Sequence, residues 1–182
     1  MKISVIFAIA LAALPVSARP EIVDSGAGGF TVRTTLNIKA SPADVYTSLV
    51  SGVSKWWDSG HTFSHNAGNL SIDAKPMGCF CEKLPGSGGV RHMEIVYADP
   101  GKGLVMIGAM GPLLTQAATG SMEIHLEKAG AGTKLVVTYA VTGYLAAGMN
   151  SWATPVDGVV RQQFTRLRSY IETGDPASKS GN

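Results

Sequence analysis

The feature that most constrains the fold is a long run of alternating segments that ends in one amphipathic helix. Between residues 69 and 144, short segments of alternating apolar and polar residues are separated by turns rich in glycine and proline. This pattern is typical of antiparallel strands joined by hairpins. Apolar residues then recur at nearly helical spacing, at Val156, Val160, Phe164, Leu167 and Ile171. Only this final helix is long enough to cover the apolar face of such a sheet. The sequence therefore predicts an α+β fold in which an antiparallel sheet wraps around a long C-terminal helix.

A further strand is expected before this run. From Phe30 to Ile38, apolar residues alternate with polar ones, which predicts a half-buried strand. Within the later run, residues 104–107 are all apolar, and this predicts a strand that is buried on both faces. Together these patterns predict one strand, two short helices, about six strands and the long helix, in that order.

The two short helices follow the first strand. Ser41, Pro42 and Asp44 are typical of a helix N-terminus, where a hydroxyl caps, proline fits the first turn and an acid favours the dipole. Gly52 is expected to end this helix before a second short one over residues 53–57. The chain then divides into a lead-in at residues 19–29, one domain at 30–173 and a polar tail at 174–182. Its length suits a single domain with a substantial core.

The first eighteen residues have the pattern of a signal peptide. Lys2 is followed by an apolar run over residues 3–14, and Val16-Ser17-Ala18 supplies the small residues of a cleavage site. A helix over that run spans about 18 Å, whereas a bilayer core is about 30 Å thick. We therefore expect cleavage after residue 18, no stable membrane insertion afterwards, and a periplasmic or secreted protein.

Charge and motifs exclude several function classes. Fifteen basic residues face thirteen acidic ones, without a basic cluster, so nucleic-acid binding is not expected. The glycine-rich stretches lead into strands rather than helices, and no nucleophile elbow or zinc-protease motif is present. His61 and His65 lie among glycines, which predicts exposed loop histidines. No catalytic residue, cofactor or metal site is assigned.

Four short motifs occur in an order that is informative about the fold. They are Ala40-Ser41-Pro42-Ala43-Asp44-Val45-Tyr46, Lys55-Trp56-Trp57, Lys75-Pro76-Met77-Gly78-Cys79-Phe80 and Gly132-Thr133-Lys134-Leu135. In this order they resemble the START-like or SRPBCC superfamily, and within it the domain related to the activator of the heat-shock-protein-90 ATPase. The resemblance implies the helix-grip (Bet v 1-like) fold and an apolar cavity between sheet and long helix. The signal peptide places a cytosolic chaperone out of reach, so that partner is not expected.

Candidate ligand-binding residues follow from this cavity. The strand over residues 90–98 places Arg91, Met93, Ile95 and Tyr97 in one phase. The guanidinium of Arg91 then either lies at or in the cavity, suited to an anionic headgroup, or reaches solvent from the end of the strand. Trp56 and Trp57 are adjacent, so one is expected in the core and one at the pocket mouth, or both serve as anchors of the fold. The remaining candidates come from the last strand and the last helix: Tyr139, Tyr144, Val156, Val160, Gln163 and Phe164.

Cys79 and Cys81 are the only cysteines of the chain. Two residues apart on a strand, they lie about 6.6 to 7 Å from each other, at the upper limit for a disulfide unless a bulge shortens the distance. Three interpretations stay open: a local disulfide, a pair of buried thiols, or two soft ligands for a metal such as Cu(I).

The sequence as a whole favours an exported binding protein for an apolar or amphipathic small molecule. One alternative is an enzyme of the cyclase or hydro-lyase kind, for which His92 and Glu94 are the nearest acid–base candidates. Their phase opposes the apolar face of the strand, so that role requires a bulge or register shift. The other alternative is thiol or metal handling through Cys79 and Cys81.

Overall fold

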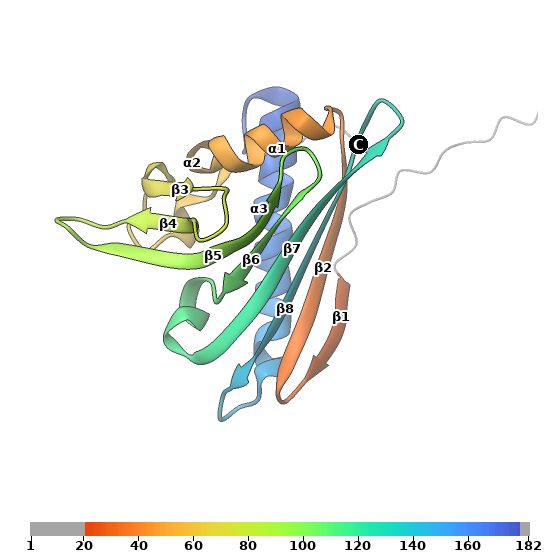
Figure 1. The fold of residues 1–182 in the computed structure, drawn as a ribbon. Helices are drawn as coiled ribbons and strands as arrows, with labels where there is room; N and C mark the ends of the chain where they lie inside the picture. Colours follow the sequence, from red (N-terminus) through yellow and green to blue (C-terminus); the bar gives the residue numbers. More distant parts are fainter. Residues whose placement is uncertain (1–20, 179–182) are drawn as a thin grey trace, which may run out of the picture.

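The computed structural model describes residues 21–178, which form one twisted antiparallel sheet and a long helix (Figure 1). The strands are β1 (Glu21–Gly26), β2 (Gly29–Ile38), β3 (Leu70–Ile72), β4 (Cys79–Lys83), β5 (Gly89–Asp99), β6 (Gly103–Gly108), β7 (Ala117–Ala129) and β8 (Gly132–Tyr144). The α-helices are α1 (Pro42–Ser51), α2 (Val53–Trp56) and α3 (Ala153–Thr173). Residues 21–178 also contain four 3₁₀ turns: η1 (Ser59–His61), η2 (Ala67–Asn69), η3 (Gly111–Thr115) and η4 (Met149–Trp152). The expected signal peptide and the last four residues of the expected tail lie outside the described residues.

The eight strands follow the order β1-β2-β8-β7-β6-β5-β4-β3. Each neighbouring pair is antiparallel. Figure 1 shows the sheet curving around α3, with α1 and α2 across one end of the helix. The predicted α+β class, with a sheet wrapped around a C-terminal helix and two short helices after the first predicted strand, is confirmed. No helix within residues 21–178 is long and apolar enough to cross a lipid bilayer.

The core lies between the concave face of the sheet and α3. In β2, β7 and β8 the apolar residues of each alternating set are buried, and their neighbours face outward. The helix contributes Val160, Phe164 and Leu167, all of which are buried against the sheet. This one-sided burial explains why the period-two pattern of these strands is so clear in the sequence.

Local signals at the helix ends are confirmed. Ser41 precedes α1 in extended conformation, and its hydroxyl accepts a hydrogen bond from the backbone N–H of Asp44 at 3.2 Å. Gly174 ends α3 in the left-handed conformation, with φ of 81°, which a residue without a Cβ adopts at little cost. The residue at which α3 ends is therefore set by a glycine cap.

Two elements differ from the sequence-based expectation. Residues 21–26, predicted as part of a lead-in, form edge strand β1, which pairs with β2 through its backbone while all six residues stay exposed. An exposed edge strand has no buried face and hence no apolar alternation by which to recognise it. The predicted burial of residues 104–107 on both faces is also wrong: Leu104 and Met106 are buried, but Ile107 is 47% exposed on the outer face.

Two bulges interrupt the alternation of β5. His92 is unpaired between the pairs Phe80–Met93 and Cys81–Arg91, and Val96 is unpaired between Ile95–Met106 and Tyr97–Val105. Because each bulge shifts the phase by one residue, Met93 and Ile95 are buried, whereas Arg91 and Tyr97 lie at the surface. The prediction that these four residues share one face is therefore wrong.

Candidate functional site

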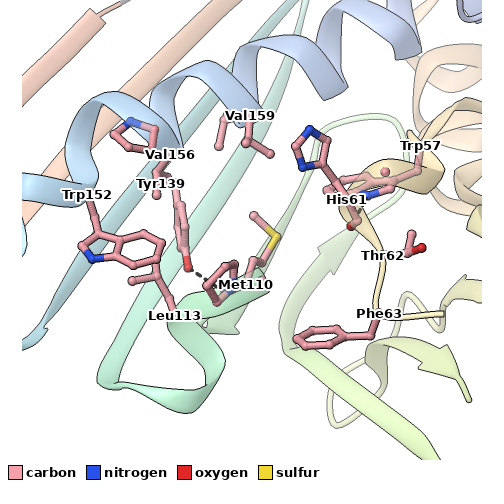
Figure 2. A pocket seen from close by; sticks show the side chains of 15 residues that line it. Trp57, His61, Thr62, Phe63, Met110, Leu113, Tyr139, Trp152, Val156 and Val159 are labelled. Atoms are coloured by element: carbon pink, nitrogen blue, oxygen red, sulfur yellow. Dashed lines mark hydrogen bonds between the residues drawn. The ribbon is translucent and has the colours of Figure 1, made fainter. Parts of the chain in front are cut away.

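A pocket of about 400 Å³ opens between α3, the sheet and two loops (Figure 2). Its walls are mostly apolar side chains. It is lined by Trp57, Gly60, His61, Thr62, Phe63, Met110, Gly111, Pro112, Leu113, Tyr139, Trp152, Pro155, Val156, Val159 and Val160. The first half of α3 forms one wall, the η1 loop a second and the η3 turn a third. Its volume falls within the range of small-molecule sites in proteins, about 300 to 1,000 Å³.

The structure divides the predicted cavity residues into three groups. Four of them line this pocket: Trp57, Tyr139, Val156 and Val160. Five are buried but are not among its lining residues: Trp56, Met93, Ile95, Gln163 and Phe164. Three lie at the surface away from it: Arg91, Tyr97, which is 51% exposed, and Tyr144, which is 75% exposed. Arg91 pairs with Glu94 at 2.9 Å instead of facing the cavity.

The adjacent tryptophans have different surroundings, as one of the two predicted arrangements requires. Trp56 is buried against Phe164, with ring centroids 5.9 Å apart, and its indole N–H donates to the carbonyl of Ser48. Trp57 lines the pocket, packs edge-on against Phe80, and its indole N–H donates to the carbonyl of His61. Trp56 thus belongs to the core, and Trp57 connects the core to the pocket wall.

Tyr139 lies at the inner end of the pocket, where β8 passes beneath α3 (Figure 2). Its hydroxyl donates to the carbonyl of Gly108 and accepts from the backbone N–H of Met110, both at 3.3 Å. Burial raises the pKa of this phenol to about 12, so it stays neutral. The side chain closes the pocket and fixes the start of the η3 turn, and its hydroxyl is already engaged.

The wall that carries Thr62 and Phe63 is attached to the sheet by a buried carboxylate. Glu82 of β4 accepts hydrogen bonds from the backbone N–H groups of Phe63, at 3.1 Å, and of Ser64. It also pairs with Nε2 of His92 at 3.0 Å, and both side chains are almost fully buried. The bulge at His92 makes this pair possible, because it turns a residue of the outward phase toward the interior.

Burial and hydrogen bonding act in opposite directions on this pair. Burial raises the pKa of Glu82, but the hydrogen bonds from Ser64, Phe63 and His92 outweigh it and leave the pKa below its usual value. Burial lowers the pKa of His92 by more than the neighbouring carboxylate raises it. The pair therefore consists of a charged Glu82 and a neutral His92 that donates from Nε2. Since neither residue lines the pocket, their contribution is to hold its wall.

Gln163 was predicted to orient a ligand, but its contact is with the chain itself. Its Oε1 accepts from the backbone N–H of Asp58 at 2.9 Å, and the residue is fully buried. Its Nε2 has no hydrogen-bond partner among residues 21–178. Gln163 therefore connects α3 to the start of the η1 loop.

His61 lines the pocket, although its sequence context predicts only an exposed loop histidine. It ends η1, lines the pocket, and its Nε2 lies 3.3 Å from Oε1 of Gln162 on α3. The side chain is exposed, as predicted, yet the loop brings it to the rim of the pocket. The local signal for this position is the Asp58-Ser59-Gly60 turn. Asp58 caps η1 by accepting a hydrogen bond from the N–H of Gly60, and this fixes the turn that ends at His61.

Cys79 and Cys81 form a disulfide, one of the three alternatives left open by the sequence. Their Cα atoms are 5.4 Å apart, within the usual range for such bonds. Both cysteines lie on β4, which pairs with β5 on either side of the bulge at His92: Cys79 is opposite Glu94, and Cys81 is opposite Arg91. Among residues 21–178, no group of three or more histidine, cysteine or acidic side chains is arranged to hold a metal ion.

Comparison with known proteins gives the fold but no closer relationship. No family model matches the sequence, and no curated protein is similar to it. Among solved structures, EF2215 of Enterococcus faecalis, a conserved protein of unknown function, is 18% identical with a TM-score of 0.60, over 90% of this chain and 83% of its own.

Two further structures carry the fold assignment. The Aha1 dimer of Colwellia psychrerythraea is 17% identical with a TM-score of 0.55, over 79% of this chain and 97% of its own. Ara h 8.0201 is 14% identical with a TM-score of 0.57, over 80% of this chain and 98% of its own. At these identities the likeness concerns the fold alone, and it agrees with the sheet order and the long helix described above. The chain has the helix-grip fold of Bet v 1-like and SRPBCC-type proteins.

Proposed function

We propose that this protein binds an apolar or amphipathic small molecule in the pocket between α3, the sheet and the η1 and η3 segments. The observation that carries the proposal is the pocket itself. Its volume of about 400 Å³ suits a small organic molecule, and nearly all its lining side chains are apolar or aromatic. Most of the few polar groups on its walls are engaged by the chain, so binding energy comes mainly from burial of apolar surface.

The enzyme alternative finds less support in the arrangement. The bulge required for His92 is present, but the imidazole is buried against Glu82 and neither residue lines the pocket. Glu94 pairs with Arg91 at the surface. The thiol and metal alternative requires free sulfurs, whereas Cys79 and Cys81 are bonded to each other.

Export is part of the proposal and is supported by two independent features. The first eighteen residues have the pattern of a signal peptide, and a disulfide is expected to persist in an oxidising compartment. The intact mass of the protein recovered from its host tests both points. A chain that begins at Arg19 and gains two mass units on reduction supports export, and a chain that retains residues 1–18 with free thiols contradicts it.

Binding is tested with the fluorescent probe N-phenyl-1-naphthylamine and a variant that fills the pocket. Val159 lines the pocket from α3, so Val159→Trp places an indole in the space a ligand needs. Val96→Trp adds the same side chain at an exposed position on β5 outside the pocket and serves as the control. We expect the wild type and the control to bind the probe and Val159→Trp to lose at least tenfold in affinity. Urea unfolding of each variant establishes that it is folded.

The proposal is overturned if the wild type does not bind the probe, or if a folded Val159→Trp variant binds it as well as the wild type does. Native mass spectrometry adds a readout that does not depend on the probe. A small molecule carried through purification from the host is expected on the wild type and absent from Val159→Trp.

A further inference from the structure

The polar groups on the pocket wall differ in whether the chain already uses them. The hydroxyl of Tyr139 both donates and accepts, the hydroxyl of Thr62 donates to the carbonyl of Ser59, and the indole N–H of Trp57 donates to the carbonyl of His61. Trp152 brings only an N–H donor. Among the lining side chains of residues 21–178, the hydroxyl of Thr62 keeps acceptor capacity but is buried, and Nδ1 of His61 is the one nitrogen or oxygen acceptor that makes no hydrogen bond.

The proton on His61 is placed by a chain of hydrogen bonds that starts at Asp58. A carboxylate only accepts hydrogen bonds, so the group of Gln162 that lies 2.8 Å from Oδ2 of Asp58 is its amide NH₂. The oxygen of the same amide is therefore the atom that faces Nε2 of His61 at 3.3 Å. Because that oxygen is an acceptor, Nε2 carries the proton, and Nδ1 of the neutral ring keeps a free lone pair.

Hydrogen bonds hold the backbone of His61, and Gln162 on α3 contacts its ring. Its backbone N–H donates to the carbonyl of Asp58 at 3.0 Å, and its carbonyl accepts from the indole of Trp57 at 3.1 Å. Asp58 is itself attached to α3, since its backbone N–H donates to Gln163. Figure 2 shows the imidazole at the rim, between Trp57 and Val159, with its second ring nitrogen on the side of the pocket. An acceptor fixed in this way loses little conformational entropy when a ligand binds.

We propose that His61 selects, among the molecules of suitable size and apolarity, those that carry a hydrogen-bond donor at the end nearest the rim. A phenol, an alcohol or an amide N–H would donate to Nδ1 while the rest of the molecule lies between Tyr139, Val156 and Leu113. Asp58 and Gln162 are positioning residues that set the tautomer. This inference rests on the proposed function and adds the chemical class of the ligand.

The tautomer is tested in the free protein, without any ligand. Long-range ¹H–¹⁵N correlation spectra at about pH 8, above the usual titration range of imidazole, distinguish a proton on Nε2 from one on Nδ1. We expect His61 in the wild type to carry its proton on Nε2, and Gln162→Leu to gain the other tautomer. His65, which does not line the pocket, provides an internal reference. A wild-type ring protonated mainly on Nδ1 overturns the inference.

Selection is tested with 2-naphthol and 2-methoxynaphthalene, which share a ring system but differ in the hydroxyl donor. The measured quantity is the ratio of the two dissociation constants, compared between the wild type and His61→Phe at about pH 8. We expect the preference for 2-naphthol to be about fivefold greater in the wild type, which corresponds to one hydrogen bond of about 1 kcal/mol. His65→Phe makes the same substitution on the same loop outside the pocket and is expected to keep the wild-type ratio.

The outcomes separate this inference from the function on which it rests. If both compounds bind and the ratio is the same in the wild type and in His61→Phe, the role of His61 is refuted while pocket binding stands. If neither compound, nor the naphthylamine probe, binds the wild type, the proposed function fails and the inference fails with it.

Discussion

Replacement of Glu82 by glutamine tests whether the buried carboxylate holds the pocket wall. The substitution preserves shape and volume but removes the charge and turns one oxygen into an NH₂ group. In the wild type, Oε1 accepts from the N–H of Ser64, and Oε2 accepts from the N–H of Phe63 and from Nε2 of His92. The side chain is fully buried, so water does not replace a lost partner.

The expected loss of stability follows from these three contacts. The amide of glutamine has only one oxygen, so its best orientation keeps the contacts with Phe63 and His92 and turns its NH₂ toward the N–H of Ser64. Hydrogen bonds to a charged group contribute about 1.5 to 3 kcal/mol, and bonds between neutral groups about 0.5 to 1.5 kcal/mol. One bond is thus lost and two are weakened. We expect the free energy of unfolding to fall by about 3 kcal/mol.

Urea unfolding followed by tryptophan fluorescence measures this change, and Glu94→Gln is the matched control. Glu94 lies on the adjacent strand and pairs with Arg91, but its side chain is 40% exposed. Exposed ion pairs contribute about 0 to 1 kcal/mol, so the control is expected to lose less than about 0.5 kcal/mol. If Glu82→Gln costs less than about 1 kcal/mol, or no more than the control, the carboxylate does not anchor the loop and the reasoning is refuted.

Two further predictions concern pH and the disulfide. Because burial lowers the pKa of His92 in the folded chain, the unfolded chain binds more protons below pH 6.5, and the free energy of unfolding should fall as the pH drops from 8 to about 5. Glu82, whose pKa in the folded chain is below 4.5, adds a further loss of stability at lower pH. The account of His92 is contradicted if the free energy of unfolding of the wild type falls no more steeply between pH 8 and 5 than that of His92→Gln. The bridge between Cys79 and Cys81 closes a loop of only three residues, so replacing both by alanine should cost about 1.5 kcal/mol. A loss above about 3 kcal/mol in urea unfolding would show that the bridge does more than restrict the unfolded chain.

The parts of the fold that the sequence predicts well are those set by local chemistry. In β2 and β8 one face is buried and the other faces solvent, so apolar and polar side chains alternate along each strand. The caps at Ser41 and Gly174 depend on the conformational preferences of single residues. These features can be predicted because they depend on the residues of the segment itself and not on which segment it contacts in the fold.

The parts that the sequence did not predict depend on partners elsewhere in the chain. The bulges at His92 and Val96 are properties of the pairing of β5 with β4 and β6, and they move Arg91 and Tyr97 out of the predicted cavity set. Strand β1 is stabilised by a backbone ladder to β2 and leaves no apolar pattern. His61 reaches the pocket only because η1 lies against α3.

The η1 loop, residues 58–64, depends on contacts with both the helix and the sheet. Asp58, at its start, is attached to α3 through Gln162 and Gln163, and Phe63 and Ser64, at its end, are attached to β4 through Glu82. The residues between these two anchors, which include His61 and Thr62, form a wall of the pocket. A loop held at both ends to different elements keeps its shape only while helix and sheet keep their spacing. The geometry of this wall is therefore a property of the whole fold, and binding at the pocket should stabilise the packing of α3 against the sheet.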